Sequence, residues 1–166
     1  LIQDNIIIQK IKLGELDFNR FFDIKKWGKY MAIVDMVGGH HGFRWNNVRL
    51  LKNSDSELIE PIGYDANAGS MLKMLLINDS TSIPNTQRKF FFKDDRIKHI
   101  YYKELKRFSE KQYLDTFFNS ISEELTNKLR CIYINNPNFI FEKDIYYQNQ
   151  NFIKAELIKI TNTKND

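Results

Sequence analysis

Residues 38–47 read GGHHGFRWNN, and this polar stretch separates two hydrophobic segments of the chain. It contains two of the three histidines, His40 and His41, together with three glycines and two asparagines. A solvated loop is usually simpler in composition, so the stretch predicts a loop with a specific role. The organisation of the fold follows from the segments on either side of it.

A helix is predicted directly before this loop. Asp23 is a suitable N-cap, because its side chain can accept a hydrogen bond from a free backbone N–H of the first turn. Apolar residues then recur at helical spacing: Ile24, Trp27, Met31 and Val34. Gly38 is placed to end the helix, since glycine readily adopts the left-handed conformation that follows many helix ends.

A β-hairpin is predicted directly after the loop. Residues 48–52 and 57–63 have the composition of strands, and residues 53–56 (NSDS) have the composition of a turn. Pro61 indicates that the return strand lies at a sheet edge or ends early, because proline cannot donate to the ladder. Asp65 then lies in a loop that Gly69 closes.

Most of the remaining chain is predicted to be helical. A helical pattern covers residues 95–108, and a last helix is predicted over residues 142–158. Between them, Ser109 and Gln112 form a capping-box pattern. They predict the start of a long helix over residues 110–134 with a buried apolar stripe. Residues 71–92 are ambiguous, with a short apolar helix at 71–77 followed by an exposed loop. The run at residues 5–13 is a strand or the end of an upstream element. We therefore expect an α+β fold, mostly α-helical, with one small antiparallel hairpin in a single domain over residues 1–166.

The composition excludes several classes of protein. The chain is 42% hydrophobic and 28% charged, which is typical of a globular domain. Its net charge is +4, but the basic residues are scattered among carboxylates, so no nucleic-acid partner is expected. Cys131 is the only cysteine, which excludes an intrachain disulfide and a cysteine-based zinc site. No apolar run is long enough to span a membrane.

The candidate site lies where the hairpin begins and ends. Asn47 and Asp65 are 18 residues apart, and a hairpin of this length should bring them together. Their oxygen atoms suit Mg²⁺ or Mn²⁺ held jointly with substrate phosphates. Protein kinases have the same order of catalytic loop, metal-binding Asn, hairpin and metal-binding Asp. On the residue pattern alone, a capped loop and an ordinary turn aspartate are the stronger explanation.

A resemblance over longer segments favours the kinase-like explanation over an ordinary turn aspartate. The segments FDIKKWGKYMAIVDMVGGHHGFRWNNVRLL (22–51) and LIEPIGYDANAG (58–69) resemble the CotH (spore-coat protein H) kinase family of atypical protein kinases. Three later segments resemble its helical end: ELKRFSEKQYLDTFF, EELTNKLRCIY and IYYQNQNFIKAEL. The most specific pieces are the Asn-x-x-Leu pattern at 47–50 and PIGYD at 61–65, which is similar to a family segment whose Asp binds metal.

The resemblance implies a protein-kinase-like C-terminal lobe and an ATP- and metal-dependent phosphotransferase. It implies that Asn47 and Asp65 bind Mg²⁺ or Mn²⁺ and the nucleotide, and that the acceptor is a protein hydroxyl, on a surface or coat protein. It also suggests an exported or cell-surface bacterial protein. Because the chain begins at Leu1 and shows no Gly-rich nucleotide loop, we expect it to be the C-terminal lobe of a longer protein.

One departure from the family pattern concerns the catalytic base. The family has an Asp a few residues before the Asn, but no Asp lies between Gly39 and Asn47 here. We predict His41, and after it His40, as the catalytic histidine, because imidazole accepts protons near neutral pH. His41 is nearer to the five-residue spacing between base and Asn in kinase catalytic loops. A loop-packing role is the alternative for both.

Arg44 has two interpretations. It could bind phosphate of the cofactor in bidentate fashion, or it could pair with Asp35, at the end of the preceding helix, and brace the loop.

Two other functions compete with the kinase hypothesis. The missing loop Asp favours a catalytically impaired kinase-like module that serves in surface or coat assembly. A metal nuclease built on the two histidines is weaker, because no basic stripe accompanies them.

Overall fold

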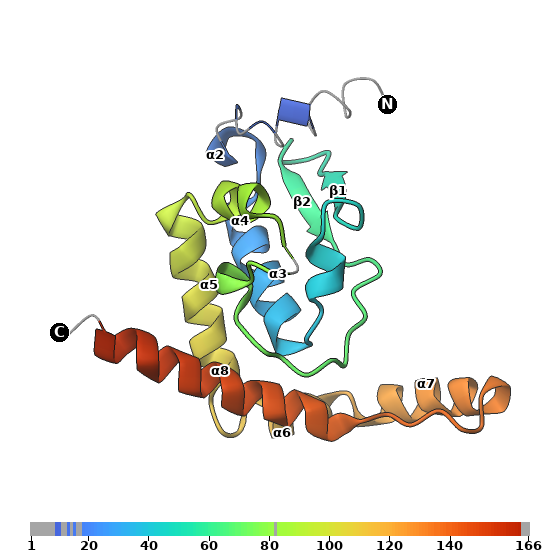
Figure 1. Ribbon diagram of the computed structural model, residues 1–166. Helices are drawn as coiled ribbons and strands as arrows, with labels where there is room; N and C mark the ends of the chain where they lie inside the picture. Colours follow the sequence, from blue (N-terminus) through green and yellow to red (C-terminus); the bar gives the residue numbers. More distant parts are fainter. Residues whose placement is uncertain (1–8, 11–12, 14, 16–17, 82, 164–166) are drawn as a thin grey trace.

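The computed structural model describes residues 9–10, 13, 15, 18–81 and 83–163, so the run at 5–13 lies largely outside the described residues. The fold is mostly helical with one two-stranded antiparallel sheet, as predicted (Figure 1). The elements in chain order are α2 (Phe18–Phe21), α3 (Ile24–Met36), the 3₁₀ turn η1 (His40–Phe43), β1 (Arg49–Lys52), β2 (Ile59–Ile62), the 3₁₀ turn η2 (Leu76–Asn78), α4 (Asn85–Phe91), α5 (Asp95–Phe108), α6 (Tyr113–Ser120), α7 (Ser122–Asn135) and α8 (Lys143–Thr163).

Helix α3 is the central element and has the ends that the sequence predicts. The Asp23 side chain accepts a hydrogen bond from the backbone N–H of Lys26 at 2.9 Å. Gly38 follows the helix with φ +63°, and a Cβ at this position would lie 1.8 Å from the carbonyl oxygen of Ser70. Only glycine fits there, because it alone combines this φ with so close an approach of a second segment.

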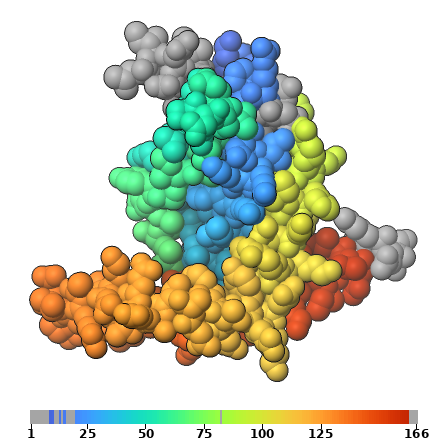
Figure 2. Space-filling view, turned by 180° about the vertical axis from the view of Figure 1, so that it is seen from behind, coloured from blue at the N-terminus to red at the C-terminus, as the bar shows by residue number. Residues whose placement is uncertain are grey.

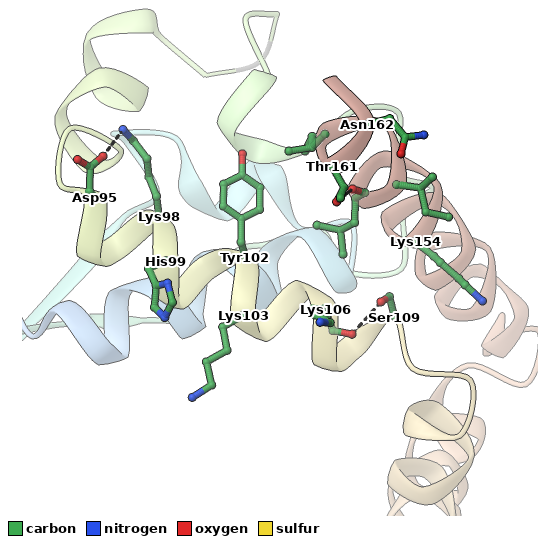
Figure 3. A pocket seen from close by; sticks show the side chains of 13 residues that line it. Asp95, Lys98, His99, Tyr102, Lys103, Lys106, Ser109, Lys154, Thr161 and Asn162 are labelled. Atoms are coloured by element: carbon green, nitrogen blue, oxygen red, sulfur yellow. Dashed lines mark hydrogen bonds and ion pairs between the residues drawn. The ribbon is translucent and has the colours of Figure 1, made fainter. Parts of the chain in front are cut away.

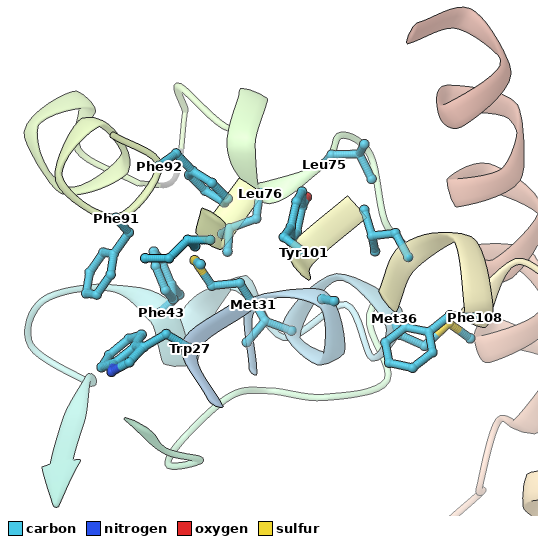
Figure 4. Close-up of a cluster of buried hydrophobic side chains, with 14 of the residues drawn as sticks. Trp27, Met31, Met36, Phe43, Leu75, Leu76, Phe91, Phe92, Tyr101 and Phe108 are labelled. Atoms are coloured by element: carbon cyan, nitrogen blue, oxygen red, sulfur yellow. The ribbon is translucent and has the colours of Figure 1, made fainter. Parts of the chain in front are cut away.

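The core is formed by α3, α5 and the segment between them (Figure 4). Trp27, on α3, is fully buried and stacks on Phe91 with ring centroids 4.5 Å apart. Its indole N–H donates to the carbonyl oxygen of Ile59 at 3.0 Å, so the polar end of a core side chain is satisfied by the hairpin. This bond fixes β2 against α3 and thereby positions the chain that leads to Asp65.

The hairpin matches the prediction. Arg49 pairs with Ile62 and Lys52 with Ile59 in antiparallel register. The Asn53 side chain accepts hydrogen bonds from the backbone of Asp55 and Ser56, at 2.9 and 3.0 Å, which is an Asx turn.

The structure corrects the prediction for residues 71–92. The predicted helix at 71–77 is an irregular segment that leads into η2, and the predicted exposed loop contains α4. Asp79 and Gln87 are buried, not exposed. The physical reason is long-range pairing: Gln87 donates to the carbonyl oxygen of Phe43, and Asp79 binds His40.

The predicted long helix over 110–134 is also wrong. Helix α5 ends at Phe108, and the Ser109 hydroxyl donates back to the carbonyl of Lys106 at 2.7 Å, so Ser109 ends one helix and begins none. The chain then forms α6 and α7 with a break at Ile121. Helix α7 has no fully buried residue, and Leu125 of its apolar stripe is only partly buried against the core. It extends sideways from the body together with the segment that leads back to α8 (Figures 1 and 2).

The last predicted helix, over 142–158, is confirmed as α8, which extends to Thr163. Among the helices that the structure describes, none has both the length and the apolar composition needed to cross a bilayer.

Candidate functional site

The site centres on η1, the short turn that contains both histidines. This turn packs against the segment that follows the hairpin. A Cβ on Gly42 would lie 2.8 Å from the carbonyl oxygen of Tyr64 and 2.9 Å from the Cα of Ala66. Glycine at position 42 therefore allows the histidine loop to lie directly against the backbone on both sides of Asp65.

His41 is the residue that joins the two predicted ligands. Its Nε2 lies 3.4 Å from Oδ2 of Asp65, and its backbone carbonyl accepts a hydrogen bond from the Asn47 amide at 3.1 Å. The structure thus brings together three residues that the sequence placed in one site, across 24 positions of chain from His41 to Asp65. The hairpin between Asn47 and Asp65 accounts for this convergence.

The two oxygen-bearing side chains differ in exposure. Asn47 is only 7% exposed and uses its amide nitrogen to hold the loop, which leaves the amide oxygen as the atom able to bind a ligand. The Asp65 side chain is 49% exposed. Asp65 also has φ +42°, a conformation that is uncommon outside glycine and asparagine or aspartate.

These residues fit a magnesium–nucleotide site by the chemistry of their atoms. Mg²⁺ binds through one or two protein oxygens and completes its shell with water and substrate phosphates. The described residues contain no cluster of three or more His, Cys, Asp or Glu side chains arranged around a metal position. The oxygen atoms of Asn47 and Asp65 match the one or two protein ligands that such a metal takes.

His40 faces away from this pair, into a buried network. Its Nε2 lies 2.7 Å from Oδ1 of Asp35, and its Nδ1 lies 2.8 Å from Oδ2 of Asp79. Asp35 is fully buried and also accepts hydrogen bonds from the Tyr101 hydroxyl and, at 2.8 Å, from the backbone N–H of Leu76. The network links α3, the histidine loop, η2 and α5.

Only part of this network is predictable from the sequence. Asp35 lies at the end of the helix before the loop, as predicted. Asp79 and Tyr101 were not predicted, because an aspartate in a polar run and a tyrosine on a helix stripe carry no local sign of a buried partner. The interpretation that Arg44 pairs with Asp35 is wrong: the Asp35 carboxylate is occupied by the network, and no ion pair among the described residues includes Arg44.

Arg44 has an unusual environment of its own. Its Nε is buried and has no hydrogen-bond partner among the described residues. A buried donor without a partner costs about 1–3 kcal/mol, so this N–H needs a partner such as an ordered water or a bound ion. The prediction that Arg44 binds phosphate remains a prediction.

The charges around His40 decide its protonation. Burial lowers the pKa of His40, but hydrogen bonding and attraction to Asp35 and then Asp79 outweigh burial and raise the pKa above the ordinary histidine value. A protonated imidazole donates from both ring nitrogens, which is what two carboxylate partners require. Burial also raises the pKa of Asp35, against the opposing effects of His40 and Tyr101.

The raised pKa of His40 predicts a pH dependence of stability. The folded state binds this proton more tightly than the unfolded chain, whose histidine pKa is about 6.5. The stabilisation is therefore complete below about pH 6.5 and is lost as the pH rises through the folded-state pKa. We expect the free energy of unfolding, measured by urea titration, to fall as the pH is raised from about 6 to 9.

His40→Gln should remove most of this pH dependence, because the glutamine does not titrate. The matched control is His99→Gln, which removes an exposed histidine of α5 and keeps the network around His40 intact. An unchanged slope in the His40 variant would exclude the network as its source.

A scan against protein-family models, a search of curated proteins and a search of solved structures each found no match to this chain. The resemblance to the CotH kinase family therefore rests on the quoted segments alone.

Proposed function

We propose that this chain forms the C-terminal-lobe part of a kinase-like phosphotransferase of the CotH type, which uses ATP and Mg²⁺ or Mn²⁺ to phosphorylate hydroxyl groups of a protein. One observation carries the proposal: His41 contacts both Asn47 and Asp65, so the histidine loop and the two ends of the hairpin form one site. Protein kinases place their catalytic loop, metal-binding Asn and metal-binding Asp in this order around such a hairpin.

Each residue then has a distinct role in the proposed enzyme. Asp65 and the amide oxygen of Asn47 hold the metal, which when bound would neutralise charge on the phosphates. His41 is one-third exposed and accepts the hydroxyl proton of the substrate. Arg44 binds a phosphate oxygen.

His40 has a positioning role in this proposal. Both of its ring nitrogens are engaged by buried carboxylates, so neither is directed at a substrate. Because His40 and His41 are adjacent, the network that fixes the His40 ring also fixes the backbone from which His41 projects. Of the two histidines predicted as catalytic, we therefore retain His41 as the proposed base.

The second candidate is a kinase-like module without catalysis, acting in surface or coat assembly. The observation that favours it is the loop itself, which offers an imidazole and no carboxylate between Gly39 and Asn47. The two candidates differ in whether they bind and use nucleotide.

Calorimetry on the full-length protein separates the candidates. A phosphotransferase is expected to give a saturable heat with Mg²⁺–ATP or Mn²⁺–ATP, and none with ATP and a chelator. Incubation with the same nucleotide should add phosphate to the protein itself or to a protein acceptor, detected by mass spectrometry. Absence of both heat and phosphate with either metal would contradict the phosphotransferase and leave the assembly module.

A further inference from the structure

A hollow lies between α5 and α8, and none of the candidate-site residues lines it. It has a volume of about 1170 Å³, and Figure 3 shows its lining, with Lys98, Tyr102 and Lys106 on α5 and Lys154 on α8. The two helices contact each other, and in Figure 1 they cross near the end of α5 and diverge toward its start.

The floor of the groove is apolar. It is formed by the ring of Tyr102 and by three aliphatic side chains of α8: Leu157, Ile158 and Ile160. Ile158 is 53% exposed, and the other three are partly buried. An apolar strip that remains open between two helices is the surface that a third helix covers in packed helical proteins.

The rim of the groove is cationic. It is lined by Lys98, Lys103, Lys106 and Lys154. The carboxylate on the rim, Asp95, is paired with Lys98 at 2.8 Å. No ion pair among the described residues joins the other three lysines to a carboxylate.

The cationic surface continues beyond the groove. Lys98 also borders a smaller hollow at the start of α5, where Lys89 and Lys93 are exposed. The two glutamates nearest to the groove along these helices are already paired with other cations, Glu104 with Arg107 and Glu156 with Lys159. Among the residues that the structure describes, three of the four rim lysines therefore have no carboxylate partner.

We propose that this groove binds an acidic amphipathic helix of a protein partner. The apolar face of such a helix would cover Tyr102 and the aliphatic side chains, and its carboxylates would face the lysines on both sides. A flat bilayer would not enter a concave groove, and a nucleic acid would meet the lysines but leave the aliphatic floor in contact with water. Charge and apolar floor together thus favour a peptide helix.

The test uses a fluorescent probe peptide of about 16 residues, with leucine along one helical face and glutamate on the other, titrated with the full-length protein by fluorescence anisotropy. The double variant Lys103→Glu/Lys106→Glu should weaken binding about tenfold, because the rim charges are reversed. Ile158→Ser should weaken it about fivefold even at high salt, because that contact is apolar. Lys128→Glu, on α7 outside the groove, is the matched control and should bind like the wild type.

The outcomes are distinguishable. All four substituted side chains are exposed, and circular dichroism checks that each variant is folded. A peptide with lysine in place of glutamate should not bind. The proposal is overturned if the acidic peptide does not bind, if Lys128→Glu weakens binding as much as the groove variants, or if Ile158→Ser has no effect. It is also overturned if duplex DNA or phosphatidylserine vesicles bind in the groove more tightly than the peptide.

Discussion

In the proposed phosphotransferase, replacing Asp65 with asparagine is expected to lower phosphate transfer by the full-length protein at least about 100-fold, with little change in stability. The loss would follow from removal of the negative charge that we propose holds the metal against the phosphates, an effect worth several kcal/mol in metal-dependent enzymes. Asparagine is the right substitution because it keeps the size of the side chain and tolerates the φ of +42° at this position. Alanine would add backbone strain to the chemical effect.

The same loop offers a matched control for this experiment. Asn67, two residues further on, is exposed and also has positive φ, at 50°. Asn67→Asp should keep wild-type transfer and Mg²⁺–ATP affinity, because no role in the site is assigned to it. Undiminished transfer in Asp65→Asn would rule out the metal assignment. Asn47→Ala should also abolish transfer, but it removes the hydrogen bond to His41 as well, so Asp65 gives the cleaner measurement.

Local signals were sufficient to predict the part of the fold that builds the site. The N-cap of α3 depends on Asp23 and the turn of the hairpin depends on Asn53, and each acts on residues within a few positions of itself. Gly38 ends α3 through its positive φ, and its fit also depends on the distant Ser70. Once the helix end and the turn are fixed, the loop between them and the segment after them have little freedom. For this reason the contacts of His41 with Asn47 and Asp65 follow from the order of the elements.

The network around His40 could not be predicted in the same way. Asp79 lies 39 residues from His40, and Tyr101 lies 66 residues from Asp35. Their polar groups are buried only because α3, η2 and α5 meet at one point, and no residue near Asp79 in the sequence indicates that meeting. For this reason the prediction of an exposed loop at residues 78–89 is wrong. The run is polar, but some of its side chains have distant partners and are buried.

Helix α7 shows what an apolar pattern in the sequence leaves undetermined. Its apolar residues recur at helical spacing, and this periodicity correctly predicts a helix. Periodicity does not identify what covers the apolar face, and the described part of this chain covers none of it completely. A stripe such as Leu125, Leu129 and Ile132 therefore predicts a helix with a contact surface, but not the presence of the contact in the same chain.

Replacing Asp35 with alanine is expected to lower the free energy of unfolding by about 4 kcal/mol and the melting temperature by about 10 °C or more. The carboxylate is fully buried and accepts from His40, from the Tyr101 hydroxyl and from the backbone N–H of Leu76. Its removal leaves three donors without a partner and a cavity among core side chains. A donor buried without an acceptor costs about 1–3 kcal/mol, so the three losses together exceed those of an ordinary surface substitution.

The matched control is Asp55→Ala, in the exposed turn of the hairpin. The Asp55 side chain accepts only a long hydrogen bond, 3.3 Å, from the neighbouring Ser54 hydroxyl, and its loss should change the free energy of unfolding by less than about 0.5 kcal/mol. Chemical denaturation of both variants, followed by far-ultraviolet circular dichroism, gives the comparison. Equal stability of the Asp35 and Asp55 variants would show that the carboxylate–imidazole network does not hold the histidine loop, and that His41 owes its position to the hairpin and the glycines alone.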